Sequence, residues 1–417
     1  MKNLISKLLI ITFVLMTAVN LNAAFLKEVP QSLSQPDGSA LNCFASGDEF
    51  FNWLHDANGF TIIQNPVNGW YVYADMQNDE FIPTTLIPNK DNPAQNNLKP
   101  WLIYSEQRLR SFRQKFSIPA EYKIEGKKSE KLQSVRNRGP FNNLAIFIRF
   151  ADETGFSQNV SYFDTPYNGK NGISVYDYFY EVSYNQIEIK TNFFPQPNGQ
   201  LVLSYQDNYP RSYYKKYNAT TAPDGYKNDS ERTIREMQLL KKAVEAVAPN
   251  IPSDLDLDSD DDGTVDNVAF IVTGGPEGWA DLIWPHMWAL YYYDVRINGM
   301  RVWNFNFLMA NWFDSSVLCH EMFHTLGAPD LYRYYTSGTP VGQWDLMSNN
   351  TYPPQYTSMF MRWKYGNWID DLPEVTKSGW YELNPSSMKN GSVIKVQSRY
   401  NPDEYFVLEY RDRKSVV

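Results

Sequence analysis

Apolar and polar runs divide this chain of 417 residues into short strands first and longer mixed elements afterwards. From about residue 25 to 120, brief apolar runs separated by Asn-Gly turns predict a small, mostly β unit. An apolar run over residues 144–150 then predicts a buried central strand, and residues 187–194 and 268–273 predict two more. Residues 303–308 predict a strand at the edge of the same sheet.

Helical spacing of apolar residues marks three helices in this second region. Residues 174–183, 230–247 and about 315–326 each predict a helix, and the second carries a clear apolar face. Strands mixed with long helices indicate an α/β sandwich around a twisted mixed sheet. Beyond residue 370, three strand-like runs predict an appended β region: residues 380–383, 393–396 and 405–408.

These patterns divide the chain into four segments. Residues 1–24 combine a charged start, a short apolar stretch and small residues suited to cleavage, which is typical of a secretory signal peptide. Residues 25–138 hold the β unit and a basic linker, which is either a solvated tether or the site where a propeptide is removed. Residues 139–370 form the α/β domain, and residues 371–417 begin a C-terminal β region that we expect to be incomplete.

Composition limits the partners. A net charge of −9 argues against binding to nucleic acid or to an anionic membrane. No segment is apolar over the length that a membrane span needs. With only two cysteines, the protein has at most one disulfide and relies on its core and on bound ions. We therefore expect a secreted, monomeric protein.

Residues 320–330 read HEMFHTLGAPD and carry the clearest chemistry. On a helix, His320 and His324 lie one turn apart and face the same way, which makes two ligands of a zinc site. Glu321 takes the position of the general base of a metalloprotease. Gly327 can end the helix in a left-handed turn, so that Asp330 returns as a third ligand. Three protein ligands and an open position are typical of a catalytic zinc site.

An aspartate-rich segment suggests a second metal. Asp258, Asp260, Asp262 and Asp266 occupy positions 1, 3, 5 and 9 of a calcium-loop pattern, with glycine at position 6. Position 12 is Ala269, so the segment lacks the glutamate of an EF-hand. The alternatives are a calcium site and a solvated acidic turn.

Cys43 and His286 are open to several interpretations. Cys43 is a latency ligand that caps zinc in a proform, a buried free thiol, or a disulfide partner of Cys319. The helical position of Cys319 predicts that its side chain packs in the core. His286 is either a histidine packed among aromatic residues or part of the wall of a cleft.

Several stretches resemble the immune inhibitor A family of secreted bacterial metallopeptidases, which are metzincin-like zincins. They are residues 174–183 (SVYDYFYEVS), the acidic turn before Asn267, residues 283–286 (IWPH), the HEMFHTLGAPDLY run, and residues 344–348 (WDLMS). The resemblance implies a zincin fold in which Met347 forms an apolar turn beneath the metal. Many metzincins use histidine as the third ligand, whereas some relatives use aspartate, as Asp330 would be here. Neighbouring zincins take this ligand from a distant glutamate.

These observations predict a secreted zinc endopeptidase that acts on proteins or peptides and is made as a zymogen. Glu321 would transfer the protons, so Glu321→Ala should keep zinc and lose activity. A zinc exopeptidase with another third ligand is the nearest variant. The alternative from another class is a catalytically silent surface protein with a protease fold that binds glycan or protein.

Overall fold

The computed structural model describes residues 26–48, 50–115, 118, 137–170, 172–275, 286–333, 340–401 and 403–411. The predicted signal peptide and most of the basic linker lie outside these residues.

The N-terminal β unit (residues 26–115) is one antiparallel six-stranded sheet in which each strand pairs with the next along the chain. Gly59 and Gly69 adopt positive φ at the two predicted Asn-Gly turns, a conformation that glycine adopts without steric cost. The helix α1 (Glu106–Lys115) and the short η1 (Ala94–Asn96) follow the sheet. The strands are β1 (Leu26–Ser34), β2 (Ala40–Gly47), β3 (Asn52–His55), β4 (Thr61–Gln64), β5 (Tyr71–Gln77) and β6 (Glu80–Pro83).

The sheet of the α/β domain is mixed. Its strands lie in the order β12 (His286–Ala289), β15 (Asn304–Met309), β11 (Val268–Val272), β7 (Gly139–Arg149) and β8 (Ile187–Phe194), and β9 (Tyr205–Gln206) pairs with the end of β7. Only β12 runs antiparallel to its neighbour. The prediction of an edge strand at 303–308 was wrong, because the short β12 covers that edge. Four residues give no periodic pattern that a sequence analysis could detect.

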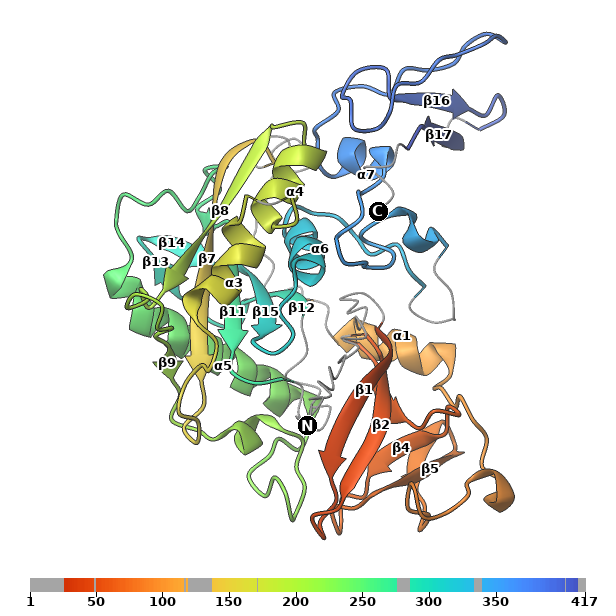
Figure 1. Cartoon of the computed structure of the whole chain (residues 1–417), viewed down its shortest axis with the longest axis vertical. Helices are drawn as coiled ribbons and strands as arrows, with labels where there is room; N and C mark the ends of the chain where they lie inside the picture. The colour runs from red at the N-terminus through yellow and green to blue at the C-terminus, as the bar shows by residue number, and fades with distance from the viewer. Residues whose placement is uncertain are drawn as a thin grey trace, which may run out of the picture.

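Helices cover both faces of this sheet (Figure 1). Alternate residues of β7 point to opposite sides. Ala145 and Phe147 pack with α3 (Val160–Asn168), α4 (Val175–Val182) and α6 (Ser315–Thr325), whereas Leu144 and Ile146 pack with α5 (Asp229–Val247). The predicted mixed α/β architecture and its three helices are therefore confirmed.

Smaller elements complete the chain. A three-stranded sheet joins β10 (Thr264–Val265), β14 (Met300–Val302) and β13 (Arg296–Ile297), and α7 (Met359–Lys364) precedes the hairpin of β16 (Val393–Gln397) and β17 (Tyr405–Glu409). Single-turn helices are η3 (Arg211–Tyr214), η4 (Ala248–Asn250) and η5 (Gly342–Trp344).

Residues 380–383 do not form the predicted strand, since they pair with no neighbouring strand and Trp380 is fully exposed. Among the described helices, none has the length and apolar content to cross a membrane.

Candidate metal centre

Helix α6 presents the HEMFH residues, and both of its ends are closed by their own side chains and backbone. At the start, the carboxylate of Asp314 accepts hydrogen bonds from the backbone amides of Ser316 (2.8 Å) and Val317 (3.2 Å). At the end, Gly327 has a φ of 99°, and the amide of Ala328 donates to the carbonyl of Phe323 at 3.0 Å. This left-handed ending satisfies the last carbonyls and reverses the chain, as predicted, so that Asp330 returns to the helix.

His320, His324 and Asp330 converge on one point. The two Nε2 atoms lie 3.0 Å apart, and Oδ1 of Asp330 lies 3.1 Å from Nε2 of His320 and 3.2 Å from Nε2 of His324. His320 is buried, whereas the other two residues are partly exposed. The structure thus brings together the three ligands that the sequence predicts.

The outward nitrogen of each imidazole is held by the backbone. Nδ1 of His320 lies 3.2 Å from the carbonyl oxygen of Leu346, and Nδ1 of His324 lies 2.8 Å from that of Ala328. Because a carbonyl can only accept, each Nδ1 carries a proton, so Nε2 is the nitrogen that faces the cluster and that binds a metal after losing any proton of its own. Such contacts are typical of metal-binding histidines, whose second nitrogen is fixed by a neighbour.

The donor set fits zinc. Two imidazole nitrogens and one carboxylate oxygen are ligands that zinc accepts, and bond lengths of about 2.0–2.1 Å in a tetrahedron place neighbouring ligand atoms about 3.3 Å apart. The observed separations of 3.0–3.2 Å are close to that value. Three ligands leave the fourth position free for a substrate or water.

Electrostatics at the cluster favour a positive charge. Burial acts to raise the pKa of Asp330, but the two imidazoles beside it hold that pKa well below its ordinary value. Burial acts to lower the pKa of His324, but the charge and hydrogen bond of Asp330, the charge of Glu321 and the Ala328 carbonyl together raise this pKa to about 10. Burial also raises the pKa of Glu321, against the effect of the two imidazoles. A carboxyl group with a raised pKa accepts a proton more readily near neutral pH.

A ladder of buried amides, which the sequence analysis missed, connects α6 to the central sheet. Nδ2 of Asn267 donates to the side-chain oxygens of Asn143 (2.8 Å) and Asn306 (2.6 Å). Asn306 in turn donates to the carbonyl oxygen of Glu321 at 3.2 Å, and the hydroxyl of Thr325 donates to Oδ1 of Asn267 at 3.2 Å. The signal was present as single asparagines within apolar strands, where a polar side chain needs a partner.

The residues around Met347 form a turn against the metal cluster. Met347 is fully buried, and its carbonyl oxygen accepts a hydrogen bond of 2.8 Å from the amide of Leu331, next to Asp330. The preceding carbonyl, of Leu346, is the one that faces His320. Met347 itself packs in the same apolar core as α6. The position is thus compatible with the apolar support that the resemblance implies.

The acidic turn brings together only part of its predicted set. Asp258, Asp260 and Asp262 offer oxygens within 4.8 Å of one another. Asp266 does not belong to this group; it is buried, and its Oδ2 accepts a hydrogen bond of 3.1 Å from the amide of Ser259. The two oxygens of Asp258 also accept backbone amides, from Asp262 and Gly263, each at 2.8 Å.

Cys43 does not lie in the metal cluster. It is 4% exposed within the apolar core of the β unit, where burial raises the pKa of its thiol to about 12. Cys319 is also a free thiol and packs in the core beneath α6, as predicted. The latency and disulfide interpretations of Cys43 are therefore replaced by that of a buried thiol. The reason is the strand alternation of β2, which turns Cys43 inward.

His286 is a packed histidine. Its ring stacks on Phe307 at 5.5 Å, and its Nε2 lies 3.1 Å from the carboxylate of Glu236 on α5. Its ring therefore packs toward α5, as the first alternative expects, and its charge also acts to lower the pKa of Glu321.

Comparison with protein-family models finds no match for this chain, and comparison with curated proteins finds none either. What supports a function is therefore the geometry of the site.

Proposed function

We propose that this protein is a zinc-dependent endopeptidase of the metzincin-like type, which hydrolyses peptide bonds of protein substrates outside the cell. One observation carries the proposal: two imidazole nitrogens and a carboxylate oxygen converge within 3.0–3.2 Å of one another, next to the buried carboxyl group of Glu321. The mixed sheet with an antiparallel edge strand and the helix α6 beneath it are compatible with a zincin fold.

His320, His324 and Asp330 would hold the ion. Zinc, when bound, activates a water molecule and polarises the scissile carbonyl. Glu321 accepts the proton of the attacking water and passes it to the leaving amine, and its raised pKa suits both steps. The Leu346 and Ala328 carbonyls keep both imidazoles in the tautomer that binds a metal.

Contacts of the β unit support its role as a propeptide. Trp312, in the loop that leads to α6, packs against the core of the β unit as well as against that of the α/β domain. Nδ2 of Asn218 donates to the carbonyl oxygen of Asn65 at 3.4 Å. Asp48, next to the end of β2, lies near enough to Asp330 for that charge to add to the effect of burial, and its pKa is raised to about 7. A unit docked there would restrict access of a substrate, and cleavage in the basic linker would release it.

We also propose that the acidic turn binds calcium, on the grouping of Asp258, Asp260 and Asp262. Carboxylates this close repel one another, and a divalent ion would relieve that repulsion.

The test is cleavage of a quenched-peptide library by purified protein before and after limited trypsin treatment. We expect activity after trypsin that a zinc chelator removes. Glu321→Gln should keep zinc and lower kcat by a factor of about 10²–10⁴ or more. The matched control is Glu236→Gln, which changes a buried glutamate that lies outside the metal group.

Two results would contradict the proposal. Folded, zinc-loaded protein that cleaves no peptide after trypsin treatment would favour the silent binding protein with a protease fold. Equal activity of Glu321→Gln and wild type would remove Glu321 from the mechanism.

A further inference from the structure

The backbone of the turn at residues 345–348 contacts one of the three proposed metal ligands and the neighbour of a second. The carbonyl of Leu346 faces Nδ1 of His320 at 3.2 Å. The carbonyl of Met347 accepts the amide of Leu331 at 2.8 Å and so fixes the chain beside Asp330. Two successive carbonyls therefore set the positions of a histidine and a carboxylate that lie ten residues apart in sequence.

Asp345 holds this turn in shape. Its Oδ1 accepts the amide of Met347 at 2.9 Å, and its backbone carbonyl accepts the amide of Ser348 at 3.0 Å. On the other side, its Oδ2 accepts the amide of Ser358 at 2.6 Å, and both oxygens lie within 3.2 Å of the hydroxyl of Thr357. Asp345 is fully buried, so these donors replace the water that an exposed carboxylate would bind.

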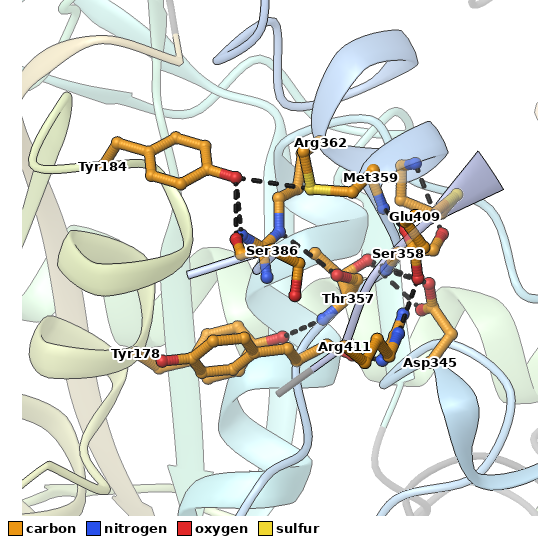
Figure 2. Close-up of polar contacts among 12 residues, drawn as sticks. Tyr178, Tyr184, Asp345, Thr357, Ser358, Met359, Arg362, Ser386, Glu409 and Arg411 are labelled. Carbon is orange, nitrogen blue, oxygen red and sulfur yellow. Dashed lines mark hydrogen bonds and ion pairs between the residues drawn. The ribbon is translucent and has the colours of Figure 1, made fainter. Parts of the chain in front are cut away.

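The partners of Asp345 are fixed in turn by two other parts of the fold (Figure 2). From α4, the hydroxyl of Tyr178 accepts the amide of Thr357 at 3.1 Å and donates to the carbonyl of Gln355 at 3.1 Å. From the C-terminal hairpin, Glu409 accepts the amide of Met359 at 2.5 Å and pairs with Arg411 at 2.5 Å.

Arg411 completes the connection. Its guanidinium donates to the carbonyl of Tyr356 at 3.2 Å, and its positive charge acts on the Asp345 carboxyl. Residues 409–411 thus hold the segment from Tyr356 to Met359, which supplies two of the donors to Asp345.

We propose that Asp345 is a positioning residue for the metal centre: it holds the Leu346 and Met347 carbonyls that orient His320 and Asp330, and Glu409 and Arg411 extend this support to the C-terminal hairpin. This rests on the proposed zinc site. It assigns to the hairpin, which the sequence analysis treated as an appended region, a part in shaping that site.

Asp345→Asn is the sharpest substitution, because both carboxylate oxygens face donors. A carboxamide keeps one oxygen and directs its own NH₂ group at the other donors, whichever way it is turned. The matched control is Asp207→Asn. Asp207 is also a buried carboxylate with donors at both oxygens, from the Tyr205 hydroxyl (3.2 Å) and from the Tyr214 hydroxyl (2.6 Å), but it lies outside the metal group.

The measurement is the zinc dissociation constant by chelator competition, together with the visible spectrum of the cobalt-substituted protein. We expect Asp345→Asn to raise the constant about tenfold and to change the cobalt spectrum, as loss of support behind a ligand does. Asp207→Asn should lower Tm without changing either. Thr357→Val, which removes a single donor, should raise the constant by roughly threefold.

The outcomes are distinguishable. Wild-type protein that binds no zinc would overturn the proposed function itself. Zinc-binding wild type with an unchanged constant in Asp345→Asn would overturn the positioning role alone, as would an equal rise in Asp207→Asn. If Asp345→Asn does not fold, an unchanged constant in Thr357→Val overturns it instead.

Discussion

The two groups of side chains that could hold a metal in this protein differ in how they are built. At the α6 cluster, the ligand atoms face one another, and the outward ring nitrogens are fixed by carbonyls from segments 4 and 26 residues away. In the acidic turn, the oxygens of Asp258 accept amides only four and five residues ahead. The first group is therefore shaped in part by a distant segment, whose Leu346 carbonyl faces His320, whereas the second is shaped by its own local turn.

This difference has a chemical consequence. Imidazole rings that backbone carbonyls already orient need little rearrangement when a metal binds, which reduces the free-energy cost of binding. Carboxylate oxygens that already accept backbone amides must share their lone pairs with a cation. We therefore expect tight, specific binding at the α6 cluster and weaker binding at the acidic turn.

Removing a ligand from the α6 cluster should have the largest effect. His324→Ala leaves two ligands, so we expect loss of stoichiometric zinc and of peptide cleavage. Metal analysis of the purified protein and the peptide assay measure both. The control is His55→Ala, which changes a buried histidine of the β unit outside the metal group. Full zinc occupancy in His324→Ala would show that the α6 cluster does not bind zinc more specifically than the acidic turn binds its cation.

Breaking the amide ladder should have the next largest effect. Asn267→Ala leaves the side-chain oxygens of Asn143 and Asn306 without their donor, and we expect a loss of about 3 kcal/mol in the free energy of unfolding. Urea denaturation measures this loss. The control Asn250→Ala, at an exposed position, should change stability by less than about 0.5 kcal/mol. An equally small loss in the free energy of unfolding for both variants would mean that the ladder does not anchor α6.

Calcium binding at the acidic turn should change stability less than loss of the amide ladder does. In zinc-replete protein, 1 mM calcium should raise Tm if the acidic turn binds it, because a ligand of the native state adds RT ln(1 + [L]/Kd). For a Kd of about 10⁻⁴ M, this is about 1.4 kcal/mol. Asp258→Asn should reduce the shift. An unchanged Tm on adding and chelating calcium would leave the segment as a solvated acidic turn.

Replacing or alkylating Cys43 should have the smallest effect on peptide cleavage. Since its pKa is raised to about 12, the folded protein at pH 8 holds only about one thiolate in ten thousand, and alkylation should be slow until urea unfolds the β unit. The thiol of the unfolded chain ionises near pH 8.5. The contribution of the neutral, buried thiol to the free energy of unfolding is therefore complete below that pH and is lost as the pH rises toward 12. Rapid alkylation of the folded protein, or faster activation of Cys43→Ser, would instead support the interpretation of Cys43 as a latency ligand of the metal.

Much of the fold and of the site follows from local sequence. The spacing of apolar residues predicted β8, α5 and α6 to within a residue or two, since periodicity depends only on neighbours along the chain. The same holds for His320 and His324, which one helical turn brings together, and for Gly327, whose left-handed turn any local reading anticipates.

The tertiary structure alone decided the rest. Asn267, Asn306 and Asp345 gain their roles from partners on other strands and loops, which no local pattern reveals. The sequence left Cys43 open as a latency ligand, a buried thiol or a disulfide partner, and strand pairing places it in the core of the β unit. Sequence fixes which atoms can bind a metal, because that is a property of each side chain. The fold decides which of them meet, because long-range packing sets the distances between them.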